Sequence, residues 1–131
     1  MPGETNLSKL LREMNPELNA GEFVFCTMDS SEGAAALEPL GSFWEKEGVT
    51  VILRRSQADD LGLSYSMVFA WITLTVHSSL EAVGLTAAVS HALAEAGIPC
   101  NVVAAYYHDH LFVPMKDAPR AMEVFRKLVV S

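Results

Sequence analysis

The side chains best suited to chemistry gather in one short segment, Tyr106-Tyr107-His108-Asp109-His110. His108 and His110 are two residues apart, so on a strand they would point to the same face and could ligate zinc together with His77. Alternatively, His108 beside Asp109 is a pairing that acid–base catalysis uses, although the sequence has no Gly-x-Ser-x-Gly nucleophile motif. The third interpretation is structural. The two tyrosines and His110 would cover the core or a dimer interface, while Asp109 would brace a hairpin through backbone amides.

A second candidate lies earlier, where His77-Ser78-Ser79-Leu80-Glu81 follows an apolar run. Ser78 and Glu81 have the spacing of a capping box, which predicts that a helix begins here. Free amides at a helix N-terminus favour a carboxylate or phosphate, and Gly84 in the first turns has no side chain to block its approach. Amides and serines would then hold a carboxylate, and His77 or a carbonyl would meet the amine of a small molecule.

The elements around these two segments must position them. Met67–Val76 is almost continuously apolar and predicts a central strand. Helical spacing follows and ends at Gly97, the strand–turn–strand Ile98–Pro114 comes next, and Asp117 caps a last helix. The order β-α-β-β-α is a ferredoxin-like unit that lacks a last strand. Its crossover makes the first two strands parallel with the third between them, so the first strand's end, the helix start and the hairpin share one edge.

The first half of the chain has a weaker pattern. Strands are predicted at Glu22–Met28 and Val49–Leu53, because both are rich in β-branched and aromatic residues. The other expectations are a helix over Leu7–Met14, a loop over Ser30–Ala36, buried side chains at Phe43 and Trp44, a helical turn ending at Gly48, and a short helix Gln57–Leu61 capped by Ser56. This half could be a degraded copy of the second, or it could supply the missing strand to the same sheet.

Composition limits the classes of function. The 131 residues are 50% hydrophobic and carry a formal net charge of −7, which allows a core and argues against binding to nucleic acid or an anionic membrane. The longest apolar run, about ten residues, is too short to span a bilayer, and no signal peptide is visible. Cys26 and Cys100 lie in predicted strands without metal-site spacing, so we expect buried, reduced thiols. These features predict a cytoplasmic protein without a cofactor or metal.

Two stretches, Thr73–Leu85 and Ala94–Pro114, resemble the ACT domain. More narrowly, the chain is similar to small stand-alone bacterial proteins with two ACT-like halves, and to the tandem ACT modules of aspartate kinases and arginine sensors. In the first half, Phe43–Leu53 looks like the family's entry into a strand. The resemblance implies an α+β fold with two ferredoxin-like βαββαβ halves, a degenerate one over residues 1–65 and another over residues 66–131. Each half would be an antiparallel sheet with helices on one face.

The resemblance also implies a function. ACT domains are regulatory modules that bind amino acids at interfaces between paired domains, through the loop after the first strand and the start of a partner's second strand. Carried over by position, the ligand-binding residues are His77, Ser78, Ser79, Leu80, Val83, Gly84, Ile98 and Asn101. The helix-terminus argument selects the same loop independently, whereas Asn101 comes from the resemblance alone.

Three hypotheses therefore compete. The first is a non-enzymatic homodimer that binds or senses an amino acid or a similar small carboxylate and regulates a partner protein. The second is a dimeric interaction module that regulates its partner without a ligand. The third is a small metal-dependent or acid–base enzyme built on His77, His108, Asp109 and His110.

Overall fold

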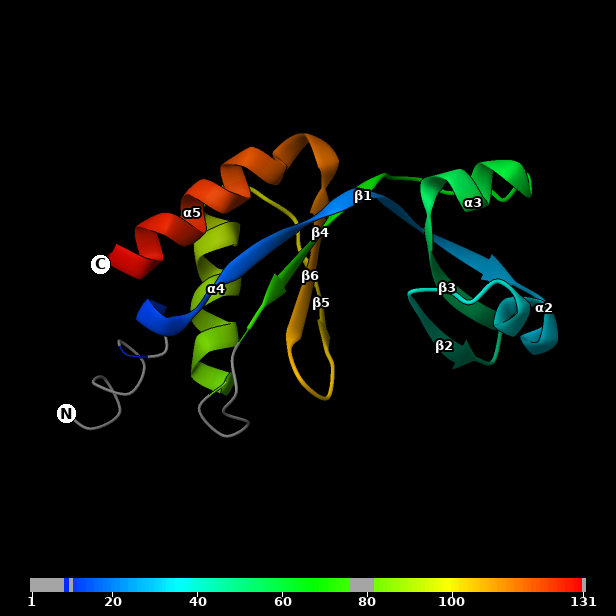
Figure 1. The fold of residues 1–131 in the computed structure, drawn as a ribbon, viewed down its shortest axis with the longest axis horizontal. Helices are drawn as coiled ribbons and strands as arrows, with labels where there is room; N and C mark the ends of the chain where they lie inside the picture. The colour runs from blue at the N-terminus through cyan, green and yellow to red at the C-terminus, as the bar shows by residue number, and fades with distance from the viewer. Residues whose placement is uncertain (1–8, 10, 76–81, 131) are drawn as a thin grey trace. The chain divides into compact units, whose positions relative to one another are not determined.

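The computed structural model describes residues 9, 11–75 and 82–130, which fall into two compact units (Figure 1). The C-terminal unit comprises the chain from Ala70 onward together with the residues up to Ala20, and the N-terminal unit comprises Gly21–Phe69. The elements in chain order are β1 (Pro16–Met28), α2 (Ser31–Ala36), β2 (Gly41–Glu45), β3 (Gly48–Arg54), α3 (Arg55–Asp60), β4 (Phe69–Leu74), α4 (Ala82–Glu95), β5 (Asn101–Ala104), β6 (Asp109–Pro114), the 3-10 turn η1 (Met115–Asp117) and α5 (Ala118–Val130). The expected α+β architecture is confirmed.

The C-terminal unit has a sheet with the strand order β1, β4, β6, β5. β5 and β6 pair antiparallel, as the predicted strand–turn–strand requires, with Val103 opposite His110. The β5–β6 turn is closed by a hydrogen bond from the Ala105 N–H to the His108 carbonyl, 3.1 Å. In this order the β-α-β-β-α run from β4 to α5 takes its fourth strand from the beginning of β1, as one of the two sequence-based alternatives proposed.

Side-chain hydrogen bonds show how the beginning of β1 lies on β4. The Thr75 hydroxyl donates to the Asn15 carbonyl (3.4 Å), and the Asn19 amide donates to the Trp71 carbonyl (3.2 Å). Residue numbers therefore rise along one segment as they fall along the other, which is the antiparallel arrangement. The first strand of the chain thus completes the sheet formed by the second half of the sequence.

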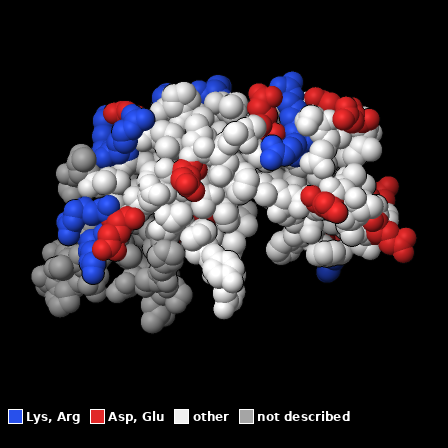
Figure 2. All heavy atoms as spheres, viewed as in Figure 1, with Lys and Arg blue, Asp and Glu red and all other residues white. Residues whose placement is uncertain are grey.

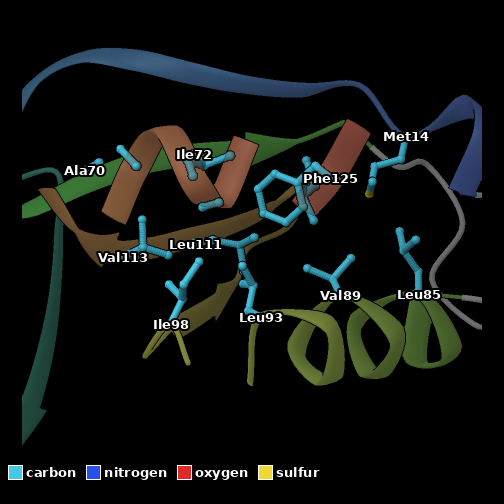
Figure 3. Close-up of a cluster of buried hydrophobic side chains, with 13 residues drawn as sticks. Met14, Ala70, Ile72, Leu85, Val89, Leu93, Ile98, Leu111, Val113 and Phe125 are labelled. Atoms are coloured by element: carbon cyan, nitrogen blue, oxygen red, sulfur yellow. The ribbon is translucent and has the colours of Figure 1, made fainter. Parts of the chain in front are cut away.

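The core of this unit lies between one face of the sheet and the helices α4 and α5 (Figure 3). Alternate residues of β4 and β6 point into it, and Phe125 of α5 packs between them and α4 (Figure 3). The buried members are Met14, Ala70, Ile72, Leu74, Leu85, Val89, Leu93, Ile98, Leu111, Val113, Ala118, Ala121 and Phe125. The predicted start and stop of the flanking helices are also found: α5 begins directly after Asp117, and Gly97 follows α4 with φ +73°.

The N-terminal unit is a smaller version of the same plan. Its strands lie in the order β2, β3, β1, all antiparallel, with Cys26 of β1 opposite Val51 of β3. Ala34 of α2 and Ala58 of α3 are buried against one face of this sheet, the face that carries Cys26 and Val51. Both helices have only six residues, whereas α4 and α5 have 14 and 13. The first half is therefore the reduced one.

Four expectations for this unit were wrong. The helix predicted over Gln57–Leu61 with Ser56 as its cap is α3, which begins at Arg55 with Arg54 at the N-cap position, so Ser56 lies inside it. The predicted loop Ser30–Ala36 is helix α2, because the Ser30 side chain caps it by accepting the Gly33 N–H at 3.1 Å. Phe43 and Trp44, predicted to be buried, are 70% and 65% exposed, and they lie on the edge strand β2, none of whose residues is buried. The predicted helical turn before Gly48 is the tight turn that joins β2 to β3.

Some predicted features fall partly outside the described residues. Lys9 and Leu11–Glu13 are helical within the predicted helix Leu7–Met14, while the capping pair Ser78 and Glu81 lies outside. The boundary between residues 65 and 66 stays a prediction about the two halves. Among the residues that the structure describes, no helix is long and apolar enough to cross a membrane.

Phe125→Ala should lower the free energy of unfolding by about 3–5 kcal/mol, because it removes a fully buried ring and leaves a cavity. Tyr106→Ala is the control: loss of an aromatic ring that is 93% exposed should cost less than about 1 kcal/mol. Urea unfolding followed by circular dichroism measures both. Equal losses for the two variants would contradict the assigned core.

Candidate functional site

The structure describes only part of the predicted ligand-binding set. His77, Ser78, Ser79 and Leu80 lie outside the described residues, as does the side chain of Val83. Gly84 is exposed near the beginning of α4. Asn101 is exposed at the first position of β5. The ligand site at this loop therefore stays a prediction. Two residues of the predicted set, Gly84 and Asn101, lie on the surface.

Ile98 has a different environment from the other predicted residues. Its side chain is 3% exposed and belongs to the core between the sheet and α4. Its backbone N–H donates to the Leu93 carbonyl at 2.9 Å, which closes the end of α4. Ile98 therefore fixes where β5 begins, and only through that geometry would it affect a ligand.

One side-chain contact joins the predicted hairpin to the start of α4. The Thr86 hydroxyl donates to Asp109 Oδ2 at 2.9 Å. Thr86 lies two residues after Gly84, so this bond holds the first residue of β6 against the first turns of the helix. The topology argument is confirmed here, because helix start and hairpin do share an edge. Asp109 therefore bonds to a side chain and not to the backbone amides that the sequence suggested. Sequence reasoning missed this contact because nothing local marks Thr86 as the partner of Asp109.

His110 lies on the face of the sheet that the helices leave uncovered. It alternates with the core residue Leu111, as Trp71 and Thr73 alternate with Ile72. The Trp71 indole N–H donates to His110 Nδ1 at 3.0 Å, and the Thr73 hydroxyl lies 3.2 Å from the same nitrogen. The Asn19 amide donates to that hydroxyl oxygen at 2.9 Å. The network therefore joins three neighbouring strands, β1, β4 and β6.

This network sets the protonation of His110. An indole N–H can only donate, so Nδ1 must be an unprotonated acceptor and the neutral ring carries its proton on Nε2. Burial lowers the pKa of His110, and the neighbouring His108 lowers it further, against an opposing effect of Asp109. His110 is thus built into the sheet as a neutral hydrogen-bond acceptor.

The remaining chemically capable groups are less suited to catalysis. Burial raises the pKa of the Cys100 thiol to about 11, and burial raises the pKa of Cys26 as well. Tyr106 and Tyr107 are 93% and 76% exposed, so they do not cover the core. The tip of the β5–β6 hairpin shows no charged atoms in Figure 2. Within the described ranges, no group of three histidine, cysteine or acidic side chains is placed to hold a metal ion.

The fold also reveals a short internal repeat. Thr27-Met28-Asp29-Ser30-Ser31 ends β1 and enters α2, and Thr75-Val76-His77-Ser78-Ser79 follows β4 and precedes α4. The first stretch therefore joins a strand to a helix, and the second holds the corresponding place in the chain order. In the first copy, Ser30 is the N-cap of α2. Sequence reasoning missed this match because the loop Ser30–Ala36 was not recognised as a helix start.

Two clefts open in the N-terminal unit. The larger, about 560 Å³, is lined by Phe25, Cys26, Thr27, Thr50, Ser64, Tyr65 and Ser66. The smaller, about 400 Å³, is lined by Gly21, Glu22, Arg54, Arg55, Ser56 and Asp59. The larger cleft offers hydroxyl groups and an aromatic wall, whereas the smaller one carries four charged side chains. Sequence reasoning assigned neither.

Comparison with family models places ACT domains along most of the chain. One model described as an ACT domain matches residues 2–70, and a second ACT domain model matches residues 67–127. No match was found among curated proteins.

Solved structures show the same architecture. A Vibrio cholerae protein described as being of unknown function and a possible transport protein is 45% identical, with a TM-score of 0.88 over 97% of this chain and 98% of that chain. A protein from Agrobacterium tumefaciens has 15% identity and a TM-score of 0.70 over 88% and 89%. The ligand-free regulatory subunit of aspartate kinase from Thermus thermophilus has 9% identity and a TM-score of 0.62 over 86% and 95%. The two ferredoxin-like halves predicted from the sequence are thereby confirmed.

His110 should make the fold sensitive to acid. Its folded-state pKa is lowered, so its stabilising contribution is present above the ordinary histidine pKa and is lost as pH falls through the folded value. Urea unfolding should give a lower free energy of unfolding at pH 5 than at pH 7.5. This loss should be smaller in His110→Asn, by the uptake of up to about one proton, because asparagine keeps an acceptor that does not titrate. An unchanged dependence in His110→Asn would contradict the network.

Proposed function

Because this chain belongs to the ACT domain family, we propose that it is a non-enzymatic regulatory protein that binds an amino acid. The observation that carries the proposal is the match of an ACT domain to each half of the chain, over residues 2–70 and 67–127. ACT domains are regulatory ligand-binding modules, and the fold is shared with regulatory subunits of aspartate kinase. The acidic composition and the short apolar runs support a cytoplasmic role.

The proposed site is the loop from His77 to Gly84 with the start of β5 at Asn101. Three features support it. Helix α4, with 14 residues, offers N-terminal amides to a carboxylate. Gly84 is exposed and has no side chain to fill the approach. The bond between Thr86 and Asp109 holds the hairpin beside this end of the helix.

Edge strand β2 supports a homodimer as the assembled form. Phe43 and Trp44 are exposed on a strand whose outer backbone groups face no neighbour in the sheet order, a feature that favours pairing with another strand. Antiparallel pairing of two copies centred on Phe43 would set Ser42 opposite Trp44 and Gly41 opposite Glu45. No two like charges would then meet across the new ladder.

Phe43→Lys should therefore favour the monomer, because it places two positive charges opposite each other at the centre of the proposed ladder. Sedimentation velocity over a concentration series measures the change. Glu95→Lys, an exposed change of charge on α4, serves as the control and should remain dimeric. A wild-type chain that stays monomeric at every concentration would rule out the assembly.

The ligand proposal is tested with a thermal-shift screen of the twenty amino acids. One or a few should raise the melting temperature, since a ligand that binds only the native state at 100 times its Kd adds about 2.7 kcal/mol. Gly84→Val should abolish that shift by filling the approach to the helix start. Ala94→Val, at an exposed position near the other end of α4, should retain it.

A screen without any shift at millimolar concentrations would contradict amino-acid binding and would favour the interaction module that acts without a ligand. A Gly84→Val protein that no longer folds would assign Gly84 to packing. In that case the shift retained or lost in His77→Ala decides whether the loop binds.

A further inference from the structure

The larger cleft of the N-terminal unit, about 560 Å³, is lined by strand residues that point away from the helices. Cys26 of β1 and Val51 of β3 lie opposite each other and belong to the core that packs against α2 and α3. Side chains alternate between the two faces of a strand, so Phe25, Thr27 and Thr50 lie on the other face. The volume is within the range of about 300–1,000 Å³ typical of small-molecule sites.

Phe25 supplies the apolar surface of this cleft. Its side chain is half-buried, and the centre of its ring lies 5.2 Å from the centre of the Phe69 ring, with 66° between the two planes. This edge-type contact holds the Phe25 ring in one orientation. The face of an aromatic ring carries partial negative charge and attracts C–H groups, so Phe25 suits the apolar face of a ring-shaped ligand.

Hydroxyl groups supply the polar surface of the cleft. They belong to Thr27, Thr50, Ser64 and Ser66, and all of these residues except Thr50 are exposed. A side chain at Gly48 would place its Cβ 2.9 Å from Thr27 Oγ1, so glycine at this position leaves room for the hydroxyl. Each hydroxyl can donate one hydrogen bond and accept others, which is also what the hydroxyls of a sugar or cyclitol can do.

The charges around the cleft disfavour an ionic ligand. None of the seven described residues that line it is charged at neutral pH, and the Tyr65 hydroxyl is already paired: it donates to Asp59 Oδ1 at 2.7 Å and accepts from Arg55 Nε at 3.0 Å. The Thr50 hydroxyl donates to Glu45 Oε1, which places a carboxylate beside the cleft that repels an anion. Glu45 is exposed, so water and salt weaken its attraction for a cation.

We propose that this cleft is a second ligand site, which binds a neutral hydroxylated ring of the size of a monosaccharide or cyclitol. The apolar face of the ligand packs on Phe25, and its hydroxyls pair with those of Thr27, Ser64 and Ser66. The site lies within the N-terminal unit and is separate from the loop at Gly84, so it does not depend on the binding of an amino acid there.

Nuclear magnetic resonance titration of the full, ¹⁵N-labelled chain tests the proposal. The neutral probes are methyl glucoside, methyl galactoside and myo-inositol. Methyl glucuronide is the charged form of the glucoside ring, and cyclohexanol is a ring of similar size with a single hydroxyl. At least one neutral probe should shift the amides of residues 25–27, 50 and 64–66 and reach saturation. The charged ring and cyclohexanol should each bind several-fold more weakly, because of repulsion by Glu45 and of missing hydrogen bonds.

Two variants assign the binding to the cleft. Ser66→Ala removes an exposed hydroxyl and should weaken the neutral probe about two- to tenfold, the loss of one hydrogen bond. Ser42→Ala, at an exposed serine of β2 that does not line the cleft, is the matched control and should bind as the wild type does. Glu45→Gln keeps an acceptor for Thr50 without its charge, so it should bring glucuronide binding close to that of the glucoside. A purely structural role would not produce this selective change.

Equal binding of the neutral, charged and single-hydroxyl probes would overturn the ligand class. Shifts confined to residues 82–86, or the absence of a saturable shift for every neutral probe at its solubility limit, would reject the cleft as a binding site and leave the amino-acid proposal standing. Wild-type affinity for the neutral probe in Ser66→Ala, together with unchanged glucuronide binding in Glu45→Gln, would also contradict the proposed site.

Discussion

The antiparallel pairing of the beginning of β1 with β4 is the constraint on which the C-terminal unit depends. Without it, the β-α-β-β-α run from Phe69 to Val130 would leave β4 as an unpaired edge beside its own core. The pairing is held by side chains as well as by strand order, because Asn19 bonds both the Trp71 carbonyl and the Thr73 hydroxyl. A residue near the N-terminus therefore fixes a strand that begins about fifty positions later, and the fold of the second half requires the first.

The same pairing determines what the unit can offer a ligand. β4 leads into the residues before α4, and its core residues set the face on which that helix packs. On the other face, Trp71 and Thr73 keep His110 as an acceptor, so the histidine that has the spacing of a zinc ligand is occupied by hydrogen bonds within the sheet. Asp109, the candidate acid–base partner, is bonded to Thr86 and joins the hairpin to α4. The segment with the most conspicuous chemistry thus has an architectural role, and the surface it leaves accessible lies at the helix start near Gly84.

The features that local sequence could predict are those with local causes. Asp117 marked the start of α5, and Gly97 marked the end of α4, because caps and stops act within one turn. Phe43 and Trp44 were expected in the core on hydrophobicity alone, but they lie on an edge strand, a position that only the tertiary pairing of the strands defines. Of the candidate site, sequence reasoning named Gly84 and the resemblance named Asn101, and both are exposed. The bonds of Asp109 and His110 connect residues 23 to 39 positions apart and leave no local signal. The charged cleft has the same origin, since Glu22 meets Arg55 only after β1 pairs with β3.

The central claim is that an amino acid binds at the beginning of α4. A crystal structure of the full chain with the amino acid that stabilises it most would test this claim most directly. We expect the ligand carboxylate at the N-terminal amides of α4, next to Gly84 and within reach of Asn101 from this or a second copy. A saturating ligand that leaves this loop empty would contradict the account.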